Sequence, residues 1–239
     1  MIQGVILASD ETHLTNFSGS KVFHAVYMTL GNIHGNIQWQ PDSGAWLLLA
    51  ILPTSSFTQT VLKYTSPKSH VKLTKNEVAT LPGILKHQLF HGCMKIVTAP
   101  LHPSQELHPV LGPDRKVHMC RGHLLGYIAD MKEQCMIACV AARSCPICTA
   151  QPHTDGTTIR DHLTARKHTG ASTLHVLRKV RAENPDSPTW KFWTLVYKEK
   201  CGVSGYVEHP FWEDLDVGPS QFLCQDLLHG GHKFLWDHP

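Results

Sequence analysis

The opening stretch of the chain constrains the fold more than any other feature. Residues 4–8 (Gly-Val-Ile-Leu-Ala) form a short apolar run that leads into Ser9, Asp10 and a hydroxyl-rich turn. An apolar run that follows a glycine and ends in turn formers predicts a buried strand, with Asp10 at its carboxyl end. Ligands and metal ions collect at this edge of α/β sheets, so Asp10 is a candidate for chemistry. The simpler alternative is that Asp10 caps a turn with its side-chain oxygen.

Two more strands are expected soon after the first. Residues 22–30 are rich in β-branched and aromatic side chains and end at a turn signal. Residues 45–52 are continuously apolar, which is typical of a strand covered on both faces. Together the three runs predict an antiparallel meander. Residues 54–82 show weak periodicity and predict a loop, whereas apolar residues at helical spacing predict an amphipathic helix over residues 84–97.

A second apolar run ends in a carboxylate and repeats the opening arrangement. Residues 124–129 lead directly into Asp130, and after a polar turn another apolar run at residues 136–140 favours a return to strands. Three strands, a helix, a fourth strand and a second carboxylate follow the order of the ribonuclease-H-like nucleotidyl-transfer core. We therefore predict an α/β fold with a ribonuclease-H-like mixed sheet, flanking helices and a cysteine-knuckle insertion.

The cysteine knuckle predicts a structural zinc site. Cys145 and Cys148 enclose Pro-Ile, and His162 and His168 complete a C-x2-C-x13-H-x5-H array. Two thiolates and two imidazoles form a closed zinc tetrahedron, which leaves no open position for a reacting water. The chain is rich in histidine, so other residues are alternative ligands: Cys139, His153 and His175. If no metal binds, the two knuckle cysteines are ordinary small apolar residues.

Charge and composition narrow the class of protein. The chain has 239 residues, 42% hydrophobic and 17% charged, and a net charge of only +3, so neither disorder nor a strongly basic nucleic-acid binder is indicated. Positive charge is local, because residues 160–200 contain nine Lys or Arg against four Asp or Glu. A secretory leader is not evident, and the longest apolar run is too short to span a bilayer. We expect a reducing compartment and no membrane partner.

The last third of the chain combines helices with one further polar pair. Residues 171–183 predict a helix whose basic side chains form a solvated face or follow a phosphate backbone. The aromatic side chains of residues 190–200 have helical spacing, and we expect them to pack in a core. Asp226 and His229 lie one helical turn apart, so they share a metal ion, orient each other or form an exposed i,i+3 hydrogen bond.

Several motifs, in the same order along nearly the whole chain, resemble those of one family. The chain is similar to the Plavaka-type transposases of fungal mobile elements, which belong with the Kyakuja, Dileera and Zisupton transposases. The segments that carry the resemblance are residues 9–19 (SDETHLTNFSG), 26–33 (VYMTLGNI), 127–130 (YIAD) with 133–135 (EQC), 144–148 (SCPIC), 211–215 (FWEDL) and 226–229 (DLLH).

The resemblance implies a ribonuclease-H-like core that cuts and joins double-stranded DNA, at element ends and at the target, with Mg²⁺ or Mn²⁺ held by acidic residues. By position, Asp10 matches the first catalytic carboxylate, Asp130 the second, and Asp226 with His229 the acid-x-x-His motif. Relatives commonly have Tyr-Pro after the second carboxylate, where this chain has Met131 and Lys132. A nuclear location and a homo-oligomer are also implied.

The expected organisation has three parts: residues 1–140 form the first part of the catalytic core, residues 141–188 a zinc-knuckle and basic helical insertion, and residues 189–239 a return to the core. Transposases of this class need a third acidic residue on a later helix, for which Glu213 and Asp214 are the conceivable substitutes. We therefore expect a truncated and inactive fragment. The alternative is a non-catalytic, zinc-stabilised DNA-binding or interaction module; a zinc hydrolase is disfavoured because no His-Glu-x-x-His motif occurs.

Overall fold

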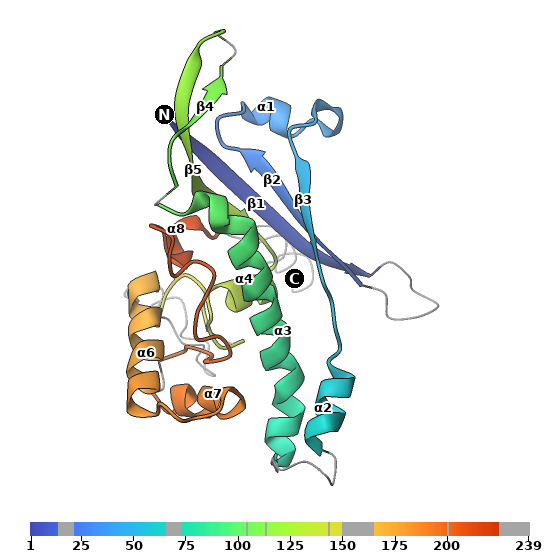
Figure 1. Ribbon diagram of the computed structural model, residues 1–239, viewed down its shortest axis with the longest axis vertical. Helices are drawn as coiled ribbons and strands as arrows, with labels where there is room; N and C mark the ends of the chain where they lie inside the picture. Colours follow the sequence, from blue (N-terminus) through green and yellow to red (C-terminus); the bar gives the residue numbers. More distant parts are fainter. Residues whose placement is uncertain are drawn as a thin grey trace, which may run out of the picture.

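The protein folds around one curled, mixed β-sheet with helices packed on it (Figure 1). The computed structural model describes residues 1–13, 22–65, 73–103, 105–112, 114–142, 144–149, 165–199 and 201–224. The strands are β1 (Ile2–His13), β2 (Val22–Leu30), β3 (Leu47–Leu52), β4 (His108–Leu111) and β5 (Val117–Ile128). The helices are α1 (Gly35–Gln38), α2 (Thr58–Thr65), α3 (Lys75–Thr98), α4 (Met131–Ile137), α6 (Gly170–Glu183), α7 (Thr189–Lys198) and α8 (Pro219–Phe222). The mixed α/β class is confirmed.

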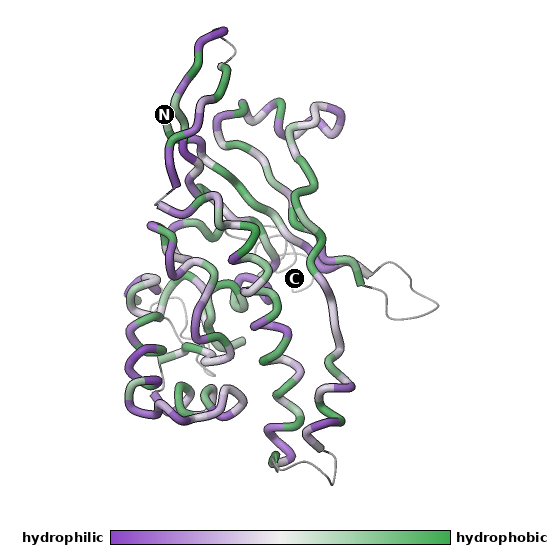
Figure 2. The backbone as a smooth tube through the Cα atoms, viewed as in Figure 1, coloured by the Kyte–Doolittle hydropathy of each residue, from purple (hydrophilic) through white to green (hydrophobic). Residues whose placement is uncertain are grey.

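The strand order is β3-β2-β1-β5-β4. β1 pairs antiparallel with β2, and β2 with β3, so the predicted meander is confirmed. β5 returns beside β1 in parallel orientation after the chain passes through α3, and a hairpin joins it to β4. β3 is an edge strand, and four of its apolar side chains are exposed, so the expectation that this strand is covered on both faces is wrong. Figure 2 shows β3 as an almost unbroken apolar stretch.

Two segments have a different secondary structure from the prediction. The expected loop over residues 54–82 contains α2 and the first two turns of α3. A capping box at Thr74 and Glu77 starts α3 nine residues before the expected helix, and Pro82 lies inside it. Residues 136 and 137 end α4, so the return to strands expected at this apolar run is wrong. The helices over residues 171–183 and at the aromatic segment are confirmed as α6 and α7.

The main core lies between the sheet and α3. Val5, Leu7 and Tyr127 from the parallel strands pack with Phe90 and Met94 of α3 in one buried cluster. The side chains that close this cluster come from late in the chain: Val207, Phe211, Trp212, Phe222 and Leu223. Burial of this apolar surface is the main favourable term that holds α3 and the late segment on the sheet.

A second, smaller cluster joins α6 to α7. Its buried members are Leu177, Val180, Phe192, Val196 and Val203. The expectation that the aromatic segment packs in a core is correct for Phe192, whereas Tyr197 is 69% exposed. Among the described helices, none is long and apolar enough to cross a membrane.

Candidate functional site

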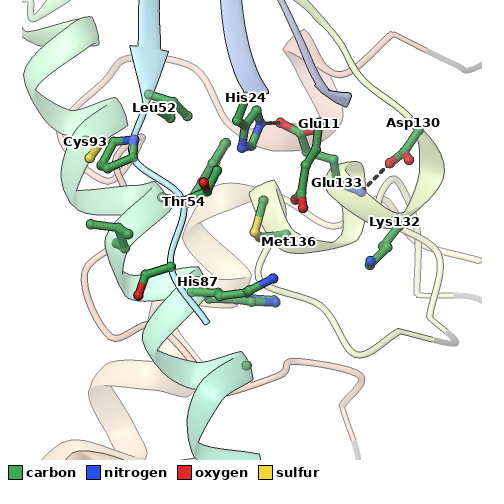
Figure 3. A pocket seen from close by; sticks show the side chains of 16 residues that line it. Glu11, His24, Leu52, Thr54, His87, Cys93, Asp130, Lys132, Glu133 and Met136 are labelled. Carbon is green, nitrogen blue, oxygen red and sulfur yellow. Dashed lines mark hydrogen bonds and ion pairs between the residues drawn. The ribbon is translucent and has the colours of Figure 1, made fainter. Parts of the chain in front are cut away.

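A cleft of about 440 Å³ opens beside the ends of β1 and β5 (Figure 3). Its walls come from the ends of β1, β2 and β3, the segment after β3, the middle of α3 and the first turn of α4. Figure 3 shows His87 of α3 on one side of the cleft and Glu11, Asp130 and Glu133 on the other. The cleft therefore combines several acidic groups with an apolar wall that includes Leu52, Phe90 and Met136.

Asp10 lies within β1 and not beyond its end. β1 continues to His13 because it stays paired with β2, whereas its pairing with β5 ends at Ala8. Asp10 is exposed, and its Oδ2 accepts a hydrogen bond from the Thr12 hydroxyl at 2.7 Å. Because side chains alternate along a strand, Glu11 shares the face of the buried Ser9 and lines the cleft, while Asp10 points to the other face.

Asp130 is the N-cap of α4. Its Oδ1 accepts the Glu133 backbone N–H at 2.7 Å, which satisfies one of the free donors at the start of this helix. The side chain is exposed and lines the cleft. The parallel pair of Ala8 with Ile128 is the last between β1 and β5, so Asp10 and Asp130 each follow it by two residues.

A buried polar network lies beneath this edge of the sheet. Glu133 Oε1 is 3.1 Å from His24 Nε2 and accepts a short hydrogen bond from the Ser9 hydroxyl, and that hydroxyl is 2.8 Å from the Tyr127 hydroxyl. All four residues are buried, with at most 7% of their accessible surface exposed. The His24 ring also stacks on Phe90, with centroids 5.7 Å apart. The network thus joins β1, β2 and β5 to α4.

The network shifts the pKa of two of its members. Burial lowers the pKa of His24, but the hydrogen bond to Glu133 and the charges of Glu133, Glu11 and Asp10 outweigh it, so the net shift is upward. Burial, with the nearby Glu133 carboxylate, raises the pKa of Tyr127 far above its ordinary value, so this phenol stays protonated. The contact with Glu133 therefore favours the protonated form of the His24 imidazole.

The two histidines of α3 are neutral. Burial and the positive charge of Lys132 lower the pKa of His87 to about 4. Burial lowers that of His91 to about 3; its Nδ1 accepts the Phe211 N–H at 3.2 Å, and its Nε2 lies 3.1 Å from the Met136 carbonyl oxygen. His91 therefore holds α3, α4 and the late segment together.

The knuckle residues are brought together in part. The Ile147 N–H donates to Cys145 Sγ at 3.4 Å, and the His168 N–H donates to the Ile147 carbonyl at 2.8 Å. His168 is 4% exposed, and within the described residues its Nε2 has no hydrogen-bond partner. His162 and the alternative ligand His153 lie outside the described residues, as do Asp226 and His229. Groups of three or more metal-binding side chains are absent from the described part of the chain.

The other alternative zinc ligands lie elsewhere. Cys139 is fully buried, 3.6 Å from His91 Nε2, and burial raises the pKa of its thiol. His175 is exposed on α6. Burial, and then the charge of Cys145, raise the pKa of the Cys135 thiol to about 11.

The basic segment is only partly available to a ligand. Arg181 Nε donates to Glu208 at 2.8 Å, and its guanidinium lies 4.4 Å from the centre of the Phe192 ring, so Arg181 supports the fold. Lys179 is paired with Glu199 at 2.8 Å. In contrast, Arg166, Lys167 and Arg178 are exposed.

Sequence reasoning missed Glu11, His24 and Glu133. The alternation of β1 would have placed Glu11 on the buried face with Ser9, and the spacing from Asp130 to Glu133 is that of an N-cap and its third helical residue. No local pattern identifies His24, because its partner lies 109 residues later.

Comparison with known proteins identifies the family. The family model described as Plavaka transposase matches residues 1–239, the whole chain. No curated protein and no solved structure matches the chain. Membership in this family implies a DNA transposase, and hence a protein that binds DNA. The chain therefore belongs to the Plavaka transposase family.

Proposed function

We propose that this chain is the catalytic part of a DNA transposase, with divalent metal ions held by Asp10 and Asp130. The observation that carries the proposal is the end of the parallel pairing between β1 and β5 at Ala8 and Ile128. Asp10, on β1, and Asp130, just beyond the end of β5, each follow this last pair by two residues, so both lie at the edge where the carboxyl ends of these parallel strands meet. Asp130 lines the cleft, whereas Asp10 points to the other face of β1. Leu223 also pairs in parallel with Tyr127 of β5.

The sheet supports a ribonuclease-H-like assignment. An antiparallel meander of β1, β2 and β3 is followed by α3, and β5 then lies parallel to β1. The expected three strands, helix and further strand occur in this order, with β4 inserted before β5; Asp10 lies on the central strand β1 and Asp130 two residues beyond the end of β5.

The two carboxylates suit a hard cation. Mg²⁺ prefers oxygen ligands, keeps several waters and is commonly held by one or two carboxylates plus substrate phosphates. Asp130 uses Oδ1 for the helix cap, and among the described residues no hydrogen bond reaches its Oδ2. When bound, such ions activate water or a DNA 3′-hydroxyl and stabilise the leaving oxygen. Asp10 and Asp130 supply negative charge and fixed oxygen positions, while α4 orients Asp130 through its cap.

The test is metal-dependent cleavage of labelled duplex DNA by the full chain, and a wild-type chain that does not cleave would agree with the inactive fragment expected from the sequence. Asp10→Asn, Asp130→Asn and Asp226→Asn should each lower the cleavage rate by more than roughly 100-fold, beyond the usual cost of changing a residue that only supports a ligand. DNA affinity should be unchanged. Asp42→Asn, which changes an exposed acid between β2 and β3, is the matched control. Cleavage that survives in Asp10→Asn or Asp130→Asn contradicts the proposal.

A structural zinc ion at Cys145, Cys148, His162 and His168 is the second part of the proposal. The backbone N–H to sulfur bond at Cys145 supports it, as does the buried Nε2 of His168, which has no hydrogen-bond partner among the described residues. Elemental analysis should give one zinc per chain, and His168→Ala should lose it together with thermal stability. His175→Ala should retain both. If the purified chain contains no zinc, and added zinc does not change its melting temperature, this part of the proposal is wrong.

A non-catalytic, zinc-stabilised DNA-binding module is the alternative function. The exposed Arg166, Lys167 and Arg178 favour it, because exposed basic side chains bind phosphate, and Lys167 pairs with Cys148 of the knuckle. This function predicts DNA binding with a steep salt dependence and no metal-dependent product. The fungal origin, the nuclear location and the homo-oligomer stay predictions.

A further inference from the structure

Glu133 forms hydrogen bonds at or next to both proposed metal ligands. Its backbone N–H holds the Asp130 carboxylate at 2.7 Å, while its side chain accepts a hydrogen bond from Ser9, the residue before Asp10. Ser9 and Asp10 point to opposite faces of β1, so the position of Ser9 sets the position and rotation of the strand at Asp10. Glu133 therefore contacts Asp130 directly and contacts Asp10 through its neighbour Ser9, although the two aspartates lie 120 residues apart in the sequence.

The remaining members of the network fix Glu133 itself. His24 of β2 lies 3.1 Å from Glu133 Oε1, and the Tyr127 hydroxyl of β5 lies 2.8 Å from the Ser9 hydroxyl. The stacking of His24 on Phe90 connects the network to α3. The carboxylate is thus held from β1 and β2, and both of these contacts are buried.

A buried polar network of this kind is expensive to retain for stability alone. Apolar side chains of similar size at buried ionic positions are often neutral or stabilising, because the removal of charges from water costs free energy. What such a network gives instead is one fixed arrangement of the elements that it joins. Groups that orient metal ligands in this way typically change metal affinity or activity by about 10- to 100-fold when they are removed.

We propose that Glu133 is a positioning residue, which sets Asp130 relative to Asp10 through its own N–H, Ser9 and His24. The inference rests on the proposed function, since it assumes that the two aspartates bind the metal ion. Glu133 does not contact the metal ion or DNA in this proposal. Its removal leaves both aspartates present but changes the distance and direction between their carboxylates.

The test measures Mn²⁺ affinity of the full chain by calorimetry, together with the Mn²⁺ dependence of DNA cleavage and the melting temperature. Glu133→Ala should weaken Mn²⁺ binding by about 10- to 100-fold. Glu133→Gln keeps the shape of the side chain and its hydrogen bonds to Ser9 and His24, so it should restore affinity to within about threefold of wild type, well inside that range. Ser9→Ala removes only the link to β1 and should give an intermediate loss; it keeps the test decisive if Glu133→Ala does not fold.

The control is Glu208→Ala, which breaks the part-buried ion pair with Arg181; neither residue lines the cleft. It should lower the melting temperature without any change in Mn²⁺ affinity. Wild-type affinity in Glu133→Ala and Ser9→Ala, or an equal loss in Glu133→Gln and Glu133→Ala, overturns the positioning role. If Asp10→Asn and Asp130→Asn also bind Mn²⁺ as wild type does, the proposed function fails and this inference fails with it.

Discussion

Asp130 has two roles that a pair of substitutions separates. As the N-cap of α4, its Oδ1 accepts the Glu133 N–H at 2.7 Å, and as a proposed metal ligand it supplies a negative charge. Asparagine caps a helix about as well as aspartate, whereas alanine does not cap at all. Asp130→Asn therefore removes the charge and keeps the cap, while Asp130→Ala removes both.

The expected cost follows from the geometry of the cap. Loss of an N-cap side chain costs about 1 kcal/mol, and loss of a negative charge at a helix N-terminus costs about 0.5 kcal/mol more. We expect the free energy of unfolding to be about 1.5 kcal/mol lower for Asp130→Ala than for wild type. For Asp130→Asn we expect it to be about 0.5 kcal/mol lower. In a chain of this length, 1 kcal/mol corresponds to a shift in melting temperature of about 2–4 °C.

Urea and thermal unfolding at pH 7 measure the stability of the three proteins, and the DNA cleavage assay measures their activity. Both variants should lose cleavage, but only Asp130→Ala should lose more than about 1 kcal/mol of stability. If Asp130→Ala is as stable as wild type, the cap makes no contribution. If Asp130→Asn still cleaves DNA, Asp130 serves only as a cap and the metal role is wrong.

Two further predictions concern stability. The raised pKa of His24 means that its pair with Glu133 stabilises the fold fully below the unfolded pKa of 6.5 and loses that effect as pH rises through the folded pKa. The difference in melting temperature between wild type and His24→Gln should therefore be larger at pH 6 than at pH 8.5; a constant difference would contradict the charged pair. Gly205 has a φ of +67°, and a Cβ there would lie 2.7 Å from Val196 Cβ, so Gly205→Ala should cost about 2 kcal/mol or more in urea unfolding. Gly92, inside α3 with open space around it, is the matched control: Gly92→Ala should stabilise by about 0.5–1 kcal/mol, and equal effects at both glycines would refute this reasoning.

Apolar runs in the sequence predicted the strands of the meander better than they predicted where the helices begin and end. The three apolar runs predicted the meander, because the apolar pattern of a strand depends on its own residues and not on which strands pair with it. Weak periodicity over residues 54–82 predicts a loop and hides the start of α3, although the capping box at Thr74 begins the helix there. Residues 136–140 are apolar enough for a strand, but the cap at Asp130 begins α4 before them. Short apolar runs do not distinguish a buried strand from a buried helix end.

The sequence by itself determined the antiparallel meander, the mixed α/β class, α6 and the motifs of a Plavaka transposase, since these depend on local residue types and spacing. Only the tertiary structure decided that β3 lies at an edge and that Glu133 is held by Ser9 and His24. These features depend on contacts between residues more than 100 positions apart or on the order of the strands in the sheet. Local periodicity carries no information about either, so they become fixed only when the sheet and α4 pack together.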